Sequence, residues 1–242
     1  MLESLTLQRK VRYANIYFPT DWEPATPSSG DLDIADVQAK AKYHHGDLRE
    51  ALISAVHRLV LEEGADNVAL ADACRLAGVS TAAPYRHFRD RDEVLAEVAA
   101  RGFDALNDMV AEAIARHGEG TLEAMTAMGK MYVAFAVEQS GLFRLMFGQN
   151  PGLAESPLVI ETGNRCFGYV INQVAIYCDV HGVEGDANDI AVKLWTFVHG
   201  AASLLIDEKY DNVEGAIDVD HMIETVTPSL LGQGVSSKSA AP

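Results

Sequence analysis

The chain has few cysteines and lacks long apolar runs. Three cysteines occur in 242 residues, at positions 74, 166 and 178, without paired spacing, so we expect free thiols in a reducing compartment. No stretch approaches about 18 uninterrupted apolar residues, and no basic patch leads into an apolar run at the N-terminus. The sequence therefore predicts a cytoplasmic protein with no membrane span and no signal peptide.

Motifs of common enzymes are also lacking. No Walker loop, Gly-rich dinucleotide turn or nucleophile elbow occurs, so we expect neither catalysis nor a cofactor. The candidate metal ligands are His44, His45 and Asp47 in one segment and Cys178 with His181 in another, but neither set has the spacing of a standard site. A helical protein that binds a metal or a small molecule, or a helical partner-binding module, without any DNA function is the alternative interpretation.

Positive charge is scarce, since the formal net charge is −16. The excess of negative charge opposes non-specific attraction to nucleic acid, but the acidic residues are unevenly distributed along the chain. Residues 102–242 carry 7 basic and 19 acidic side chains, whereas residues 41–101 carry 8 and 10. Lys42, Arg86, Arg89 and Arg91 lie near the ends of the second segment. A local basic face on an acidic protein suits site-specific DNA binding with low background.

Helical periodicity is abundant, and no strand alternation is evident. Residues 1–41 are predicted to form an extension interrupted by prolines, within which residues 5–18 fit a short strand or a helix equally well. Residues 234–242 are predicted to be a flexible tail. The predicted helices span residues 48–63, 70–76, 81–88, 91–117, 122–135, 142–147, 157–180, 186–206 and 219–231.

The segment 70–88 has the pattern of a helix-turn-helix. Gly78 supplies the positive φ that the short turn requires, and Ser80 is the expected N-cap of the second helix. Such a second helix enters the DNA major groove with its N-terminal residues toward the base edges. Hydroxyl, phenol, guanidinium and imidazole groups follow on its exposed positions, and two alanines permit close approach.

Four motifs carry a resemblance to a known family. Tyr43 to Arg49, the Ala-Gly-Val-Ser turn at 77–80, Tyr85 to Phe88 and Arg91 to Leu95 resemble the TetR/AcrR family of bacterial repressors. The Trp195…His199-Gly200 pattern resembles a C-terminal subclass, the WHG domain. The resemblance implies an all-α fold of about nine helices. Three of them form the DNA-binding domain at 42–101, and a ligand-binding and dimerisation domain follows at 102–233.

The resemblance also implies what the chain does and where. We expect a homodimeric repressor on palindromic double-stranded operator DNA, released by a small, largely apolar effector. The expected DNA contacts are Lys42, Tyr43, His44, Thr81, Ala82, Tyr85, Arg86, His87 and Arg91. Arg91 stands where the family usually has lysine, and Pro84 where many members have a larger apolar residue.

Two further sets of residues complete the prediction. A Met- and aromatic-rich cluster suits an adaptable apolar pocket, although for any single member core packing is the better explanation. The expected pocket residues are Met125, Met128, Tyr132, Phe135, Phe143, Phe147, Phe167, Trp195 and His199; for Trp195 and His199 ligand contact and simple packing stay open. The expected dimer residues are Ile171, Val174, Phe197, Val198, Ala201, Leu204 and Leu205, beside the small residues 200–203.

Overall fold

The computed structural model describes residues 11–12 and 45–232 of the chain, and within these ranges the fold is almost entirely helical. The predicted tails and the three expected phosphate contacts Lys42, Tyr43 and His44 lie outside the described residues. Nine α-helices occur in the described ranges, which confirms the predicted all-α class. They are α1 (His45–Glu63), α2 (Leu70–Leu76), α3 (Arg91–His117), α4 (Leu122–Glu138), α5 (Ser140–Phe147), α6 (Pro151–Ala154), α7 (Pro157–His181), α8 (Ala187–Ile206) and α9 (Val219–Leu230).

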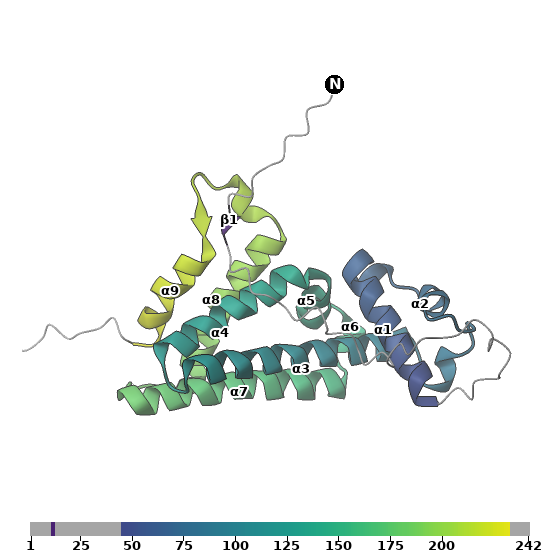
Figure 1. Cartoon of the computed structure of the whole chain (residues 1–242), viewed down its shortest axis with the longest axis horizontal. Coiled ribbons are helices and arrows are strands. Elements are labelled where there is room, and N and C mark those ends of the chain that lie inside the picture. The colour runs from purple at the N-terminus through teal and green to yellow at the C-terminus, as the bar shows by residue number, and fades with distance from the viewer. Residues whose placement is uncertain (1–10, 13–44, 233–242) are drawn as a thin grey trace, which may run out of the picture.

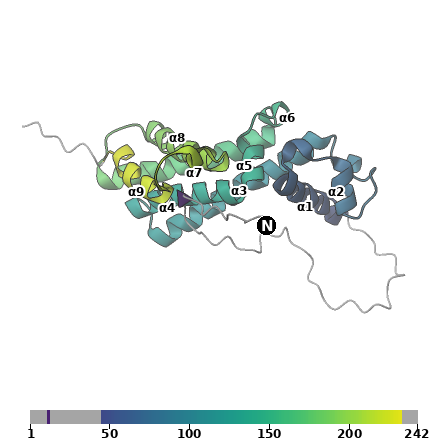
Figure 2. The same cartoon turned by 90° about the horizontal axis from the view of Figure 1, so that it is seen from above.

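The helix α3 joins a small head to a larger body. Figures 1 and 2 show α1 and α2 at one end of an elongated molecule, and α3 running from them into the body alongside α7. Asp90 caps α3 by accepting a hydrogen bond from the amide of Glu93, and Gly118 ends the helix with φ of +88°. Because one continuous helix of 27 residues belongs to both parts, a tilt of α3 in the body moves the head.

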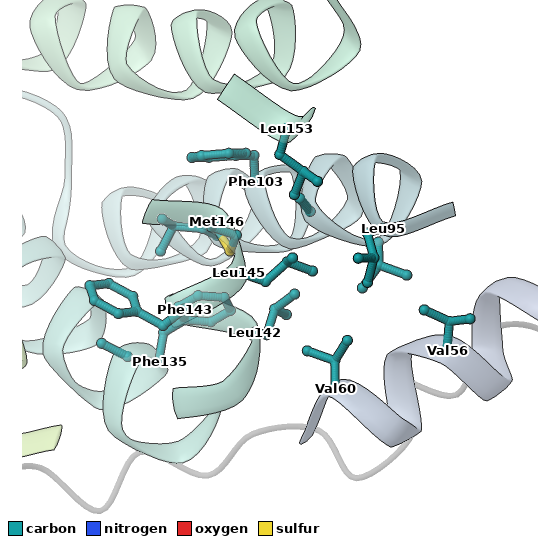
Figure 3. Close-up of a cluster of buried hydrophobic side chains, with 14 of the residues drawn as sticks. Val56, Val60, Leu95, Phe103, Phe135, Leu142, Phe143, Leu145, Met146 and Leu153 are labelled. Carbon is teal, nitrogen blue, oxygen red and sulfur yellow. The ribbon is translucent and has the colours of Figure 1, made fainter. Parts of the chain in front are cut away.

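The head is fastened to α3 by ion pairs and by an apolar core. Arg49 of α1 pairs with Glu97, and Arg101 pairs with Glu50 at 2.8 Å. The Arg101 hydrogen bond lowers the pKa of the Glu50 carboxyl below its usual value. Beneath these pairs lie apolar side chains of α1, α3 and α5, which Figure 3 shows converging between the three helices. The head and the N-terminal part of α3 therefore form one packed unit.

The helix α5 is the part of the body that touches α1. Gly141 packs so closely on the end of α1 that a Cβ atom there would overlap the carbonyl oxygen of Val60. Leu142 and Leu145 extend toward Val56 and Val60 of α1 (Figure 3), and all four side chains are buried. A movement of α5 is thus transmitted directly to the head.

A small parallel pairing departs from the sequence prediction. The strand β1 (Val11–Arg12) pairs with β2 (Ile217–Asp218), with Val11 opposite Ile217. The sequence left residues 5–18 open between strand and helix, and no strand was predicted at 217–218. Two residues are too few to show an alternating pattern, so only the paired backbone reveals the strand. The pairing brings Val11 and Arg12 beside the start of α9 (Figure 1).

The helix α8 combines membrane-like hydropathy with a place in the bundle. It has 20 residues and a mean hydropathy of 1.3, so by length and composition it fits a membrane span, although the sequence predicted none. Its inner side packs on α4 and α7. Only 28% of that apolar window is buried within the chain, and Val192 and Leu204 are exposed on the outer side. An outer face of this kind is available to a partner.

Candidate functional site

The first candidate site is the tip of the head, after α2. The turn at Gly78 has φ of +68°, as the helix-turn-helix pattern predicted. The segment beyond it carries Thr81, Ala82, Tyr85 and Arg86 on its outside, and the side chain of Tyr85 is 67% exposed. Its inner side is held by the buried Pro84 and Phe88, and the guanidinium of Arg49 lies 5.3 Å from the centroid of the Phe88 ring. Aromatic and cationic groups are thereby presented outward from a fixed base.

The predicted second helix at 81–88 is wrong in its extent. The structure shows a turn followed by a short 3-10 helix, η2 (Pro84–Arg86). With Ser80 as N-cap, the amide at position 84 would make the first intrahelical hydrogen bond, but proline has no N–H to donate. The carbonyl of Ser80 instead accepts from Ala83 in an i to i+3 turn of 2.9 Å. Ser80 does not cap this 3-10 helix, because the helix starts at Pro84 and its N-cap position is Ala83.

Two of the expected DNA contacts, Arg91 and His87, are half-buried rather than exposed at the tip. Arg91 is half-buried, and its guanidinium donates to the carbonyl oxygens of Val68, at 2.7 Å, and Ala65. It therefore ties the start of α3 to η1 (Ala65–Asn67) rather than extending into solvent. His87 is half-buried beside the tip. The expected DNA contacts did not include Arg89. Its side chain is 84% exposed at the tip of the head, where it pairs with Glu93.

The second candidate site is a cavity of about 310 Å³ inside the body. It lies at the lower end of the range of about 300–1,000 Å³ typical of small-molecule sites. Helices α3, α4, α5, α7, α8 and α9 all contribute to its wall. The lining residues are Phe103, Leu106, Val110, Met125, Met128, Gly129, Tyr132, Phe147, Gly163, Asn164, Cys166, Phe167, Val170, Leu194, Trp195, Phe197, Val198 and Thr227.

A chain of hydrogen bonds crosses one wall of this cavity. The indole Nε1–H of Trp195 donates to the hydroxyl of Tyr132 at 3.1 Å, and that hydroxyl lies 2.8 Å from Nδ1 of His199. Burial lowers the pKa of His199 and raises that of Tyr132, so both groups are neutral near pH 7. Because Trp195 only donates, the Tyr132 oxygen accepts from it, and the same hydroxyl is within hydrogen-bond distance of Nδ1 of His199.

The expected pocket residues divide into a lining set and a supporting set. Met125, Met128, Tyr132, Phe147, Phe167 and Trp195 line the cavity. Phe135, Phe143 and His199 are not among its lining residues. The ring of Phe143 stacks on His199 at 5.2 Å between centroids, so this pair supports Tyr132 from behind. Of the wall contributed by α3, α7 and α9, the sequence predicted only Phe167, because an apolar residue facing a cavity has the same spacing as one facing a filled core.

Three of the seven expected dimer residues are buried inside the single chain, and the other four are partly or fully exposed. Val174 is fully buried and Ala201 is 4% exposed, so neither side chain reaches the surface. Phe197 and Val198 line the cavity. Ile171 and Leu205 are partly buried against the core, and Leu204 is exposed at 41%. The sequence shows that α8 is apolar on all sides but not which side faces inward.

The cysteines and candidate metal ligands form no shared centre in the described part of the chain. Cys74, Cys166 and Cys178 are unpaired and buried, and burial raises the pKa of Cys166 to about 11. His181 bonds through Nε2 to the carbonyl of Gly120 at 2.9 Å. No three His, Cys, Asp or Glu side chains of the described residues come together as metal ligands.

A helix-turn-helix head on a helical body with an apolar cavity defines the class of one-component regulators. Comparison with known families supports that assignment. Residues 52–98 match the family model described as bacterial regulatory proteins of the tetR family, and residues 125–229 match the tetracyclin repressor-like C-terminal domain. The second match includes the Trp195…His199-Gly200 pattern. The chain belongs to the TetR family of DNA-binding transcriptional regulators.

Individual relatives agree with this family. The nucleoid occlusion factor SlmA of Vibrio vulnificus strain YJ016 is 33% identical over 108 residues, which are 41% of this chain and 51% of SlmA. The chain thus spans about half the length of the curated relatives it matches. A solved structure of a protein of unknown function from Rhodococcus sp. RHA1 is 28% identical with a TM-score of 0.68, covering 82% of this chain and 100% of that one.

A more distant structure shares the fold. AibR, solved in complex with isovaleryl coenzyme A and operator DNA, is 12% identical with a TM-score of 0.53 and covers 76% of this chain and 98% of that chain. Identity this low supports the fold alone.

Proposed function

We propose that this chain is a homodimeric repressor that binds palindromic operator DNA through the tip of its head and is released by a small, largely apolar molecule in the body cavity. The observation that carries the proposal is the tip itself. Thr81, Ala82, Tyr85 and Arg86 project from a turn whose inner residues are buried. Exposing a tyrosine to this extent serves no packing purpose, whereas its ring and hydroxyl suit contact with bases and phosphates.

Local charge supports the assignment despite the acidic chain. Arg86 and Arg89 lie at the tip, and Arg86 makes no ion pair with any described residue. The excess of acidic residues belongs to the body. We infer that the body faces away from DNA and that its charge suppresses binding to non-target DNA, so that affinity depends on the tip.

The outer face of α7 and α8 supports a two-fold dimer. Val192, Thr196, Gly200 and Leu204 follow one another at intervals of four residues along α8, so they share one face of that helix. A Cβ atom at Gly200, or at Gly168 of α7, would meet nothing within 4 Å in the single chain. Small residues on an exposed apolar face allow helices of two copies to approach closely, and a symmetric pair presents two tips to the two halves of a palindrome.

The helix α5 supports a route from cavity to head. Phe147 at its C-terminal end lines the cavity, and Gly141 near its start packs on the backbone of Val60 in α1. A ligand that pushes Phe147 therefore displaces the helix that touches the head. Release follows only if the ligand binds the displaced state more tightly than the DNA-bound state.

The test measures affinity for duplex DNA from the region upstream of the chain's own gene. We expect Tyr85→Ala and Arg86→Ala each to weaken binding by about 5- to 100-fold, corresponding to roughly 1–3 kcal/mol per lost contact. Arg116→Ala is the matched control, because Arg116 is an exposed arginine at the far end of α3 that pairs only locally with Glu112. Circular dichroism verifies that each variant is folded.

Two results would overturn the proposal. One is equal DNA affinity for the native chain, Tyr85→Ala and Arg86→Ala; the other is a strictly monomeric chain at micromolar concentration. Small-molecule binding without affinity for any duplex would favour a helical binding protein that has no DNA function.

A further inference from the structure

Thr227 of α9 differs from three other threonines inside the helices. The hydroxyls of Thr162, Thr196 and Thr225 donate to backbone carbonyls four residues earlier, at 2.7–2.9 Å. Thr227 is only 3% exposed and lines the cavity, yet its hydroxyl bonds to none of the described residues. A hydroxyl that lines an apolar cavity and has no protein partner is available to pair with a molecule in that cavity.

The cavity offers no charge to a ligand. None of its lining residues in the described part of the chain is Lys, Arg, Asp or Glu. His199 lies behind Tyr132, and burial lowers its pKa, so it is neutral at physiological pH. An ion in such a site would lose its hydration without gaining a counter-charge, which costs far more than one hydrogen bond returns. The cavity therefore selects uncharged molecules.

Aromatic rings form much of the wall. Phe103, Tyr132, Phe147, Phe167 and Trp195 all line the cavity. The ring of Trp195 lies 5.5 Å from that of Phe167 and 6.4 Å from that of Phe147, measured between centroids. Ring-to-ring packing is favourable beyond the area it buries, so a flat aromatic ligand fits these walls better than a flexible chain.

We propose that the cavity binds an uncharged aromatic compound whose hydroxyl pairs with Thr227. Thr227 can donate to or accept from such a group, whereas the hydroxyl of Tyr132 is already engaged with both Trp195 and His199. This deepens the proposed function, because it names the class of the releasing molecule and rests on that molecule occupying this cavity.

The test uses three probes of one shape: naphthalene, 2-naphthol and 2-naphthoate, with binding measured by equilibrium dialysis on the full chain. We expect 2-naphthol to bind about fivefold more tightly than naphthalene, the worth of one hydrogen bond of about 1 kcal/mol. We expect 2-naphthoate to bind at least tenfold more weakly than 2-naphthol.

Substitutions at two neighbouring threonines locate the contact. Thr227→Val keeps the shape and removes the hydroxyl, so the fivefold preference for 2-naphthol should vanish while naphthalene binds as before. Thr225→Val is the matched control on the same helix, since Thr225 is exposed and already bonds to the carbonyl of His221. It should retain the preference.

Each outcome separates this proposal from the DNA-binding one. Equal binding of 2-naphthoate and 2-naphthol, no binding of any probe, or the same preference in Thr227→Val as in Thr225→Val would overturn the ligand class. Duplex affinity is measured on the same samples. Retained DNA binding without a preference for 2-naphthol over naphthalene refutes the ligand class alone. That preference without any DNA binding refutes the regulator function alone.

Discussion

Gly141 is the point where the body touches the head through backbone atoms, and Gly141→Ala tests that contact. A Cβ atom at position 141 would overlap the carbonyl oxygen of Val60 and approach Cα of Leu61 at 3.2 Å. No rotamer change relieves an overlap with backbone, so either α5 or the end of α1 must shift. Shifting them separates Leu142 from Val60 in the core that Figure 3 shows.

The expected change in the free energy of unfolding for Gly141→Ala combines two opposing contributions. Overpacking of this kind costs about 1–3 kcal/mol. Replacing glycine by alanine in a helix returns at most about 1 kcal/mol, and less near a helix start. The net loss in the free energy of unfolding is therefore about 1–2 kcal/mol. For a chain of this size each kcal/mol lowers Tm by about 2–4 °C, so we expect a decrease of about 2–8 °C.

Urea and thermal denaturation followed by circular dichroism measure this loss. Gly163→Ala is the matched control, because a Cβ atom there would meet the Phe103 ring at 3.5 Å, an ordinary contact. We expect that variant to match or exceed native stability. Should Gly141→Ala prove as stable as Gly163→Ala, the tight contact between α5 and α1 is wrong, and with it the route from cavity to head.

Two further predictions concern the head. Burial lowers the pKa of His57 from 6.5 to about 4, so between these pH values the unfolded state binds a proton that the folded state does not. The free energy of unfolding therefore has its full value above pH 6.5 and falls by on the order of 3 kcal/mol as the pH decreases to about 4. In urea titrations across that range His57→Gln should lose less stability than the native chain, and identical slopes would contradict the assignment. Arg91→Ala leaves the carbonyls of Val68 and Ala65 without their donor and should cost about 1–3 kcal/mol in the same assay. Unchanged stability with reduced DNA affinity would instead make Arg91 a phosphate contact.

Helix positions were predictable because caps and periodicity are local properties of the sequence. The predicted 91–117 helix is α3 as observed, and the predicted 186–206 helix begins one residue later, with Asp186 as its N-cap. The predicted 81–88 helix failed for an equally local reason, the missing amide of Pro84.

Which side of a helix faces which neighbour is not a local property, and there the sequence predictions were least complete. Val198 and Ala201 were expected at a dimer seam, yet both are turned inward, Val198 toward the cavity. Thr227 was not singled out, because in the sequence a buried threonine that bonds its own backbone is indistinguishable from one that does not. Only the packed helices reveal the difference.

The same geometry links the two candidate sites. The wall residue Phe147 and the contact residue Gly141 lie six positions apart on α5, which has only eight residues. A helix this short moves as a rigid body, so it cannot yield at the cavity end without shifting at the head end. The ion pairs Arg49–Glu97 and Arg101–Glu50 bind α1 to α3. A push on α5 therefore tilts the head together with α3 rather than detaching α1, and in the proposed symmetric dimer a tilt of one head changes the separation of the two tips.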